Sequence, residues 1–265
     1  MKSDGGAKRV WCVVESDDDV EVFESFFLKQ IVSVLPSTNE NGKRSCQNVE
    51  TIVRDLYAEE DNPLVFGIRD TDYTCFSDAY IKPENVFLTD GRDLEMMMLK
   101  SSSVINGLKA WDSGFPDIVM HSADTMRFMG YLRIYNDLNQ TSCIFKDNLT
   151  KVSIIWDDST HTVYPDYKER LFSKFKACID SPLTRLEFDQ FVTDKFLKAK
   201  SNYDICRGHD VCRMACVMMV KKEFSRPSDL FNRMKDSYSI EDYRQTSLYN
   251  EVKDWADNRE LKIFV

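Results

Sequence analysis

Three acidic side chains stand at the ends of two apolar runs. Glu15 ends the run that begins at Arg9, and Asp70 and Asp72 form an Asp-x-Asp pair at the end of the run that begins at Leu64. Carboxylates brought close together repel one another unless a cation lies among them, and Mg²⁺ prefers such oxygen ligands. The pattern therefore predicts a site for Mg²⁺, with Mn²⁺ as the alternative ion, and with it phosphoryl-transfer chemistry.

The elements that would position these carboxylates belong to an α/β fold. Both apolar runs are rich in β-formers and continuously apolar, as are strands of a parallel sheet that is buried on both faces. We expect further strands at residues 32–35 and 85–89, with helices between the strands. Ligands of such sheets gather at the carboxyl ends of the strands. The prediction is a small, mostly parallel sheet flanked by helices, with Glu15, Asp70 and Asp72 at one edge.

The chain is expected to form two parts. Residues 1–100 would form the catalytic domain with the sheet, and residues 101–265 a mainly helical extension packed on it, because no Gly/Ser linker separates them. The first helix of the sheet domain is expected to start at Asp17 and to include residues as far as Ile31. In the extension we expect a strand or hairpin within residues 143–156.

Composition limits the functional classes. The 265 residues are 43% hydrophobic and carry a net charge of −9. No apolar stretch approaches the roughly 20 residues that cross a bilayer, so we expect a globular, cytoplasmic protein without membrane contact, whose eight cysteines are reduced. The acidic balance disfavours non-specific nucleic-acid binding but is compatible with a groove lined by local basic clusters. The candidate basic residues are Arg127, Arg133, Lys195, Lys198, Lys200, Lys221 and Lys222.

The acidic residues also have structural interpretations. Those at residues 17–19 would complement the positive end of a helix dipole. Asp70 and Asp72 would form an Asx-type turn. Those at residues 93–95 would cap the methionine-rich helix that follows.

A second constellation could bind zinc. Cys206, His209, Cys212 and Cys216 lie within eleven residues, and the last three could share one face of a helix. The alternative is a buried helix, which the apolar residues around Cys216 indicate. His209 alone has two interpretations, as an acid near a metal site or as a polar residue of the core.

Four motifs, taken in order, resemble one family. They are Glu15 with Asp19, Asp70-x-Asp72, Asn85-Val86-Phe87 followed by Arg92-Asp93-Leu94-Glu95, and Gly208-His209-Asp210. Together they look like the DUF4435 family, whose fold belongs to the TOPRIM group that topoisomerases, primases and OLD-type nucleases share. The resemblance covers residues 8–100 and returns around residues 203–220.

The resemblance implies roles for individual residues. It assigns the catalytic metal to four carboxylates, those of Glu15, Asp19, Asp70 and Asp72. Glu95 would complete or support the site. His209, in the matching late motif, could reach the metal site or the scissile phosphate as an acid, or could fill a polar position of the core. Ser16 is a departure, because the family usually has glycine directly after the glutamate, and a side chain there restricts close backbone approach to a phosphate.

The function that the resemblance implies is a Mg²⁺-dependent TOPRIM-like endonuclease, a hydrolase that cleaves the phosphodiester bonds of RNA, tRNA among them, or of DNA. The family also implies a toxin-like effector of bacterial antiviral defence, as in PARIS, held by an ABC-type ATPase sensor. Homodimerisation is an open alternative. Two other functions stay open, a non-catalytic interaction module that binds an ABC-type ATPase and a phosphatase of small nucleotides. The chain lacks a G-x4-G-K phosphate loop, so it is not expected to be the ATPase itself.

Overall fold

A computed structural model describes residues 9–38, 45–58, 64–145, 149–179, 181–219 and 226–265. The chain forms two compact units. The sheet unit comprises Met1–Asp72, Ala79–Met97 and Tyr238–Val265, and the helical unit comprises Tyr73–Asp78 and Met98–Ser237. These units differ from the division expected near residue 100, because the last part of the chain belongs to the sheet unit.

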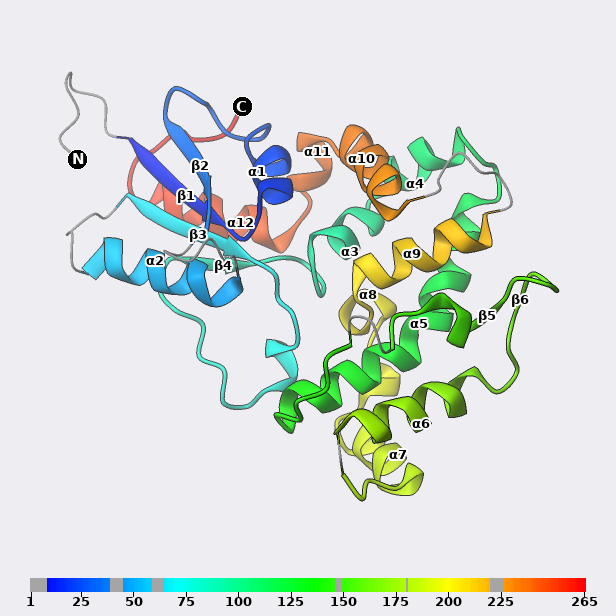
Figure 1. The fold of residues 1–265 in the computed structure, drawn as a ribbon. Coiled ribbons are helices and arrows are strands. Elements are labelled where there is room, and N and C mark those ends of the chain that lie inside the picture. Colours follow the sequence, from blue (N-terminus) through cyan, green and yellow to red (C-terminus); the bar gives the residue numbers. More distant parts are fainter. Residues whose placement is uncertain (1–8, 39–44, 59–63, 146–148, 180, 220–225) are drawn as a thin grey trace. The chain divides into compact units, whose positions relative to one another are not determined.

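The sheet is parallel throughout and has the strand order β2-β1-β3-β4 (Figure 1). Its strands are β1 (Val10–Val14), β2 (Val32–Pro36), β3 (Val65–Arg69) and β4 (Val86–Leu88). The predicted α/β class and the four predicted strands are confirmed. Because β1 and β3 are neighbours, their carboxyl ends lie side by side, and the residues after Val14 and Arg69 share one stretch of the sheet edge.

Helix α2 (Cys46–Ala58) covers one face of the sheet. Val49 and Val53 of this helix pack with Val65 of β3 in one buried cluster, to which β1 and β4 each add a valine. Gly67 permits this close packing, because a β-carbon there would lie 2.6 Å from Cγ1 of Val49 and 2.9 Å from Cγ2 of Val53. A larger residue at 67 would push α2 away from the sheet.

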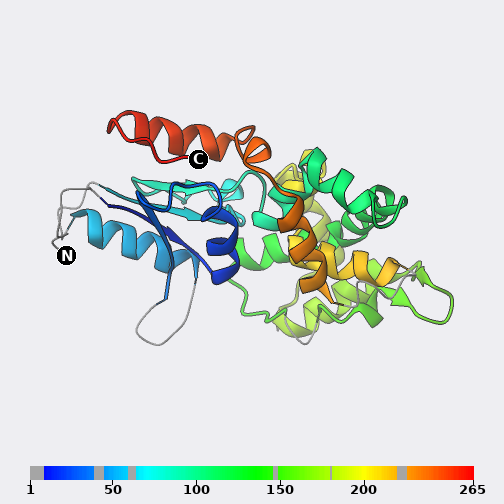
Figure 2. The ribbon, with the colours of Figure 1, turned by 90° about the horizontal axis from the view of Figure 1, so that it is seen from above.

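Helix α12 (Ser247–Asp257) covers the opposite face, as Figure 2 shows. Trp255 of α12 packs against Phe66 of β3, with ring centroids 4.8 Å apart. The Asp90 carboxylate, two residues after β4, accepts hydrogen bonds from the amides of Ser247 and Leu248, each at 2.9 Å. These contacts tie the C-terminal segment to the sheet although more than 150 residues separate Asp90 from Ser247.

The first helix is shorter than predicted. Helix α1 spans Asp17–Phe23, whereas the apolar spacing indicates a helix as far as Ile31. Phe26 instead stacks on Tyr243 of α11 (Ile240–Tyr243), with ring centroids 4.8 Å apart. Phe27 stacks on Phe264 near the C-terminus. The apolar residues after α1 therefore serve long-range packing and do not continue the helix.

The helical unit is built around the long helix α5 (Phe115–Leu138), which packs against α9 (Gly208–Met218) and α8 (Asn202–Ile205). Its other helices are α4 (Ser102–Lys109), α6 (Tyr167–Ile179), α7 (Arg185–Asp194) and α10 (Pro227–Ser237), and α3 (Leu94–Leu99) leads into it from the sheet unit. No helix within the described residues combines the length and the apolar character needed to cross a membrane.

The predicted strand or hairpin within residues 143–156 is largely wrong in position. The hairpin pairs β5 (Trp156–Asp157) with β6 (Thr162–Val163), so it starts where the predicted segment ends. The apolar residues Val152–Ile154 form a 3-10 turn. Apolar runs of this length do not distinguish a strand from a short helical turn without their tertiary partners.

Candidate metal site at the sheet edge

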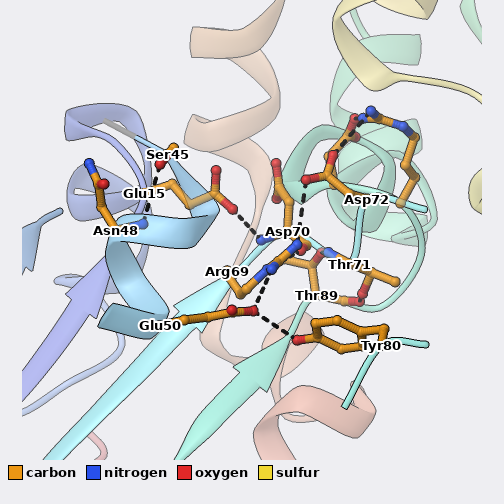
Figure 3. A network of polar contacts seen from close by, with 12 residues as sticks. Glu15, Ser45, Asn48, Glu50, Arg69, Asp70, Thr71, Asp72, Tyr80 and Thr89 are labelled. Carbon is orange, nitrogen blue, oxygen red and sulfur yellow. Dashed lines mark hydrogen bonds and ion pairs between the residues drawn. The ribbon is translucent and has the colours of Figure 1, made fainter. Parts of the chain in front are cut away.

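Glu15 joins the ends of β1 and β3. It directly follows β1, its side chain is half-buried, and its Oε1 accepts a hydrogen bond of 2.8 Å from the amide of Asp70 (Figure 3). Asp70 directly follows β3. The strand order thus brings together two acidic residues that are 55 positions apart in the sequence.

Asp72 is held in a fixed position by backbone and arginine contacts. Its backbone is left-handed, with φ of 48°, and its amide donates to the carbonyl oxygen of Arg92 at 2.8 Å. The Asp72 carboxylate lies 3.1 Å from Nη2 of Arg92 and 3.6 Å from Nη2 of Arg69. Both guanidinium groups are buried, so they orient the carboxylate and offset part of its charge.

Three side chains bring metal-binding atoms together. One oxygen each of Glu15 and Asp72 and the Sγ of Cys46, the first residue of α2, all lie within 4.8 Å of one another. Two carboxylates and a thiol form a donor set for a divalent cation, since carboxylates suit Mg²⁺ and Mn²⁺ while sulfur suits softer ions such as Zn²⁺. Burial raises the pKa of the Cys46 thiol to about 11, so an ion bound to sulfur must displace a proton.

Asp70 lies beside this group and not in it. Its Oδ1 accepts the amide of Leu94 at 3.0 Å, which places the carboxylate at the start of α3. Glu95 lies in the first turn of the same helix. Burial, then the nearby charges of Asp93 and Glu15, raise the pKa of Asp70 well above its usual value. The Leu94 contact lies at a helix start and is not the Asx-type turn expected for Asp70, and the Asp70 carboxylate is not among the grouped ligand atoms of the described residues.

Asp19 has the structural role that its position at a helix start predicts. Its Oδ2 accepts hydrogen bonds of 2.8 Å from both the amide and the hydroxyl of Ser16, and Ser16 Oγ accepts the amide of Asp19. This reciprocal capping box begins α1. Ser16 adopts extended backbone with φ of −139°, so the turn after Glu15 does not require glycine. Among the described residues, the group of ligand atoms from Glu15, Cys46 and Asp72 does not include Asp19. The metal-binding role predicted for Asp19 therefore gains no support.

Arg69 contacts several of the residues around this site (Figure 3). Its Nη1 donates to Oε1 of Glu50 at 2.6 Å, and the hydroxyl of Tyr80 donates to the same oxygen at 3.0 Å. Its Nε donates to the carbonyl oxygen of Asp70 at 2.9 Å. Sequence reasoning missed Arg69 and Cys46; an arginine inside the apolar run before Asp70-x-Asp72 is the one signal that could have indicated the first of them.

The electrostatics of the edge favour an added cation. Burial, together with the charges of Asp72 and Asp19, raises the pKa of Glu15 to about 7 against the lowering effect of the Asp70 amide and Arg69. Near neutral pH about half of the Glu15 side chains therefore carry a proton. A divalent cation would relieve the same repulsion and would compete with that proton.

The metal-free protein is expected to lose stability through Glu15 as the pH rises from about 4.5 to about 7. Because the pKa of Glu15 is about 7 in the folded chain and 4.5 in the reference state, the folded chain holds more protons across this range. Raising the pH then favours unfolding. Thermal unfolding in EDTA, compared between wild type and Glu15→Gln, measures the effect. Equal pH slopes in the two proteins would contradict the raised pKa.

The zinc constellation does not assemble within the described residues. Cys206 directly follows α8, and its Sγ donates to the carbonyl oxygen of Ala123 at 3.3 Å. Cys212 Sγ lies 3.8 Å from Sδ of Met234 in the core. Helix α9 begins only at Gly208, and its Cys212 face is buried, as the alternative interpretation predicts.

His209 belongs to the helical unit, whereas the carboxylates above belong to the sheet unit. Its Nε2 lies 3.1 Å from Nη2 of Arg213. Burial, with Arg207 and Arg213 nearby, lowers the pKa of His209. The neighbouring Asp210 is buried and accepts a hydrogen bond of 2.8 Å from Nε of Arg133. Asp210 of the Gly208-His209-Asp210 motif thus has a structural partner in α5.

The predicted basic residues divide by role. Arg133 is committed to Asp210, and Arg127 to the backbone of the segment after α7. Lys195, Lys198 and Lys200 lie in that segment. Lys221 and Lys222 lie outside the described residues.

No protein-family model matches the chain, and no curated protein matches it significantly. The resemblance to the DUF4435 family therefore stays a prediction that rests on the quoted motifs.

Proposed function

We propose that this chain is a divalent-metal-dependent nuclease that hydrolyses phosphodiester bonds of RNA or DNA. The observation that carries the proposal is the convergence of Glu15 and Asp72, from the ends of two adjacent parallel strands, with ligand atoms within 4.8 Å of each other and of Cys46. Ligands of parallel sheets bind at the carboxyl ends of the strands, which is where these two carboxylates lie.

The donor set fits Mg²⁺ or Mn²⁺. Glu15 and Asp72 would hold the ion, with Cys46 beside it. When bound, such an ion polarises a phosphoryl oxygen, lowers the pKa of a coordinated water and offsets developing negative charge. The two carboxylates suit Mg²⁺ and Mn²⁺ alike, whereas the thiol of Cys46 suits softer ions.

The side chains have separate tasks in this proposal. The Asp70 amide orients Glu15 through the 2.8 Å hydrogen bond, and Arg92 and Arg69 orient Asp72. Glu15 must give up its proton to hold the ion, so with a pKa of about 7 in the metal-free chain we expect metal binding to strengthen as the pH rises through neutrality.

The family resemblance extends the proposal to a biological setting. It suggests tRNA among the substrates and control by an ABC-type ATPase in a bacterial anti-phage system. That extension rests on analogy and not on the geometry of the site.

The proposal is tested with purified protein on total tRNA, single-stranded RNA and plasmid DNA, each with Mg²⁺, Mn²⁺ or EDTA. We expect discrete fragments of at least one polymer with either metal and none in EDTA. Free nucleotides in parallel reactions should release no inorganic phosphate. Phosphate release from nucleotides without polymer cleavage would identify a phosphatase. Absence of both reactions and of metal binding would leave a non-catalytic interaction module.

A further inference from the structure

An aromatic ring is exposed to solvent among lysines in the segment that follows α7. Phe196 is 75% exposed, whereas every other phenylalanine of the described residues is buried or half-buried. Lys195 precedes it, and Lys198 and Lys200 follow within four residues. We call residues 195–200 the Phe196 loop. Exposure of a whole aromatic ring is unfavourable in water and therefore calls for an explanation.

The backbone of Phe196 is strained. It is left-handed, with φ of 53° and ψ of 28°, a conformation that glycine and asparagine adopt easily and that a bulky residue adopts at a cost in free energy. Buried Leu197 anchors the next position as the start of the short 3-10 helix η3 (Leu197–Ala199). Strain that keeps a large apolar side chain in solvent is typical of positions retained for binding.

A cation from α5 holds the loop in shape. Nη2 of Arg127 donates to the carbonyl oxygens of Leu197 at 2.9 Å, Lys198 at 3.2 Å and Lys200 at 2.5 Å. Nη1 of the same residue donates to Oδ1 of Asn202, at the start of α8. The loop is therefore preorganised through its backbone, which leaves its side chains available to a partner.

The lysines of the loop carry charge that the protein does not neutralise strongly. Lys198 and Lys200 are exposed and form no ion pair with carboxylates of the described residues. Lys195 lies 3.6 Å from fully exposed Asp78, and an ion pair so open to water is weak. The phosphate groups of a partner can replace Asp78 in this ion pair.

We propose that the Phe196 loop binds single-stranded nucleic acid, with the Phe196 ring stacked on an unpaired base and the three lysines bound to the flanking phosphates. Aromatic rings stack on any base, and adjacent cations follow the backbone, which is how sequence-tolerant single-strand sites are built. A protein partner fits less well, because lysine is depleted from the cores of protein interfaces. The inference rests on the proposed nuclease function, for which it supplies a site that selects unpaired strands.

Binding is measured by fluorescence anisotropy with a labelled oligouridylate and with a duplex of equal length, in EDTA so that no cleavage occurs. Phe196→Asn removes the ring but suits the left-handed backbone, so it should leave the melting temperature unchanged or raised. We expect it to weaken binding of the single strand by about 5- to 100-fold. Phe196→Trp should retain binding.

The matched control is Leu186→Asn, which removes an apolar side chain of α7 that is 80% exposed but lies outside the loop. It should leave binding unchanged. Replacing Lys198 and Lys200 with glutamine should weaken binding. It should also make the negative slope of log affinity against log salt less steep, by about 0.7 for each lost phosphate contact. Equal binding by wild type and Phe196→Asn would overturn the proposal, as would binding to anionic vesicles in place of the oligonucleotide.

The same titration separates this inference from the nuclease proposal. Single-strand binding that depends on Phe196, in a chain that cuts nothing with metal present, would keep the binding loop and reject the nuclease. Metal-dependent cutting with no effect of Phe196→Asn on binding would keep the nuclease and reject the loop. Absence of any binding to the oligouridylate would also reject the loop.

Discussion

Replacing Glu15 with glutamine is expected to reduce metal-dependent cleavage by on the order of 100- to 1000-fold, the range that follows when one group that stabilises transition-state charge is lost. The substitution keeps the size of the side chain and its ability to accept the Asp70 amide, while it removes the negative charge beside Asp72 and Asp19. Loss of that repulsion should leave the melting temperature near neutral pH unchanged or raised. Single-turnover cleavage and thermal unfolding measure the two effects.

Asp18→Asn is the matched control for this prediction. Asp18 is exposed in the first turn of α1, three residues from Glu15, and is not one of the grouped ligand atoms of the described residues. It should cleave at nearly the wild-type rate. A large loss of stability in Glu15→Gln, or cleavage as fast as in Asp18→Asn, would count against a role for Glu15 in holding a metal.

Replacing Arg133 with alanine is expected to destabilise the helical unit by about 3–5 kcal/mol, because it leaves a buried carboxylate without its partner. The side chain of Asp210 is 3% exposed and that of Arg133 is 11% exposed, and they are joined at 2.8 Å. The Arg133 guanidinium also lies over the ring of Phe145, 4.4 Å from its centroid. Urea unfolding of wild type and variant measures the loss.

Two comparisons make this test specific. Lys29→Ala breaks the exposed pair with Glu24 and should change stability by less than about 1 kcal/mol. Adding Asp210→Asn to Arg133→Ala should recover much of the loss, because no buried charge then remains unpaired. If Arg133→Ala were as stable as the wild type but did not cleave, the pair would not serve stability. Asp210, the partner of Arg133, would then be a functional residue of the Gly208-His209-Asp210 motif.

The parallel sheet could be predicted because its strands are buried on both faces. Continuous apolar runs that end at Val14 and Arg69 leave little choice of element, and the carboxylates after them necessarily reach the same edge once β1 and β3 are neighbours. Glu15 and Asp72 could therefore be placed together from sequence alone.

Residues that enter the site from other elements could not be predicted. Cys46 reaches Glu15 and Asp72 only because α2 begins at that residue and packs over Gly67. Asp70 was expected among the ligands, but the amide of Leu94 competes for its carboxylate, a contact that depends on where α3 begins. Local spacing carries no information about either position.

The C-terminal segment was misplaced for a similar reason. Its packing on the sheet depends on Trp255 against Phe66 and on the Asp90 carboxylate at the start of α12. Both are contacts between residues far apart in the chain. The methionine-rich helix α3, which the acidic residues at 93–95 were expected to cap, is capped by Asp93 through the amide of Met96.

The most direct test of the metal site is calorimetric titration of Mn²⁺ into the metal-free protein at about pH 8, where Glu15 is mostly ionised. The wild type should bind Mn²⁺ saturably, and both Glu15→Gln and Asp72→Asn should lose that binding while remaining folded. Absence of binding in the wild type, or equal binding in all three proteins, would contradict a metal site between β1 and β3.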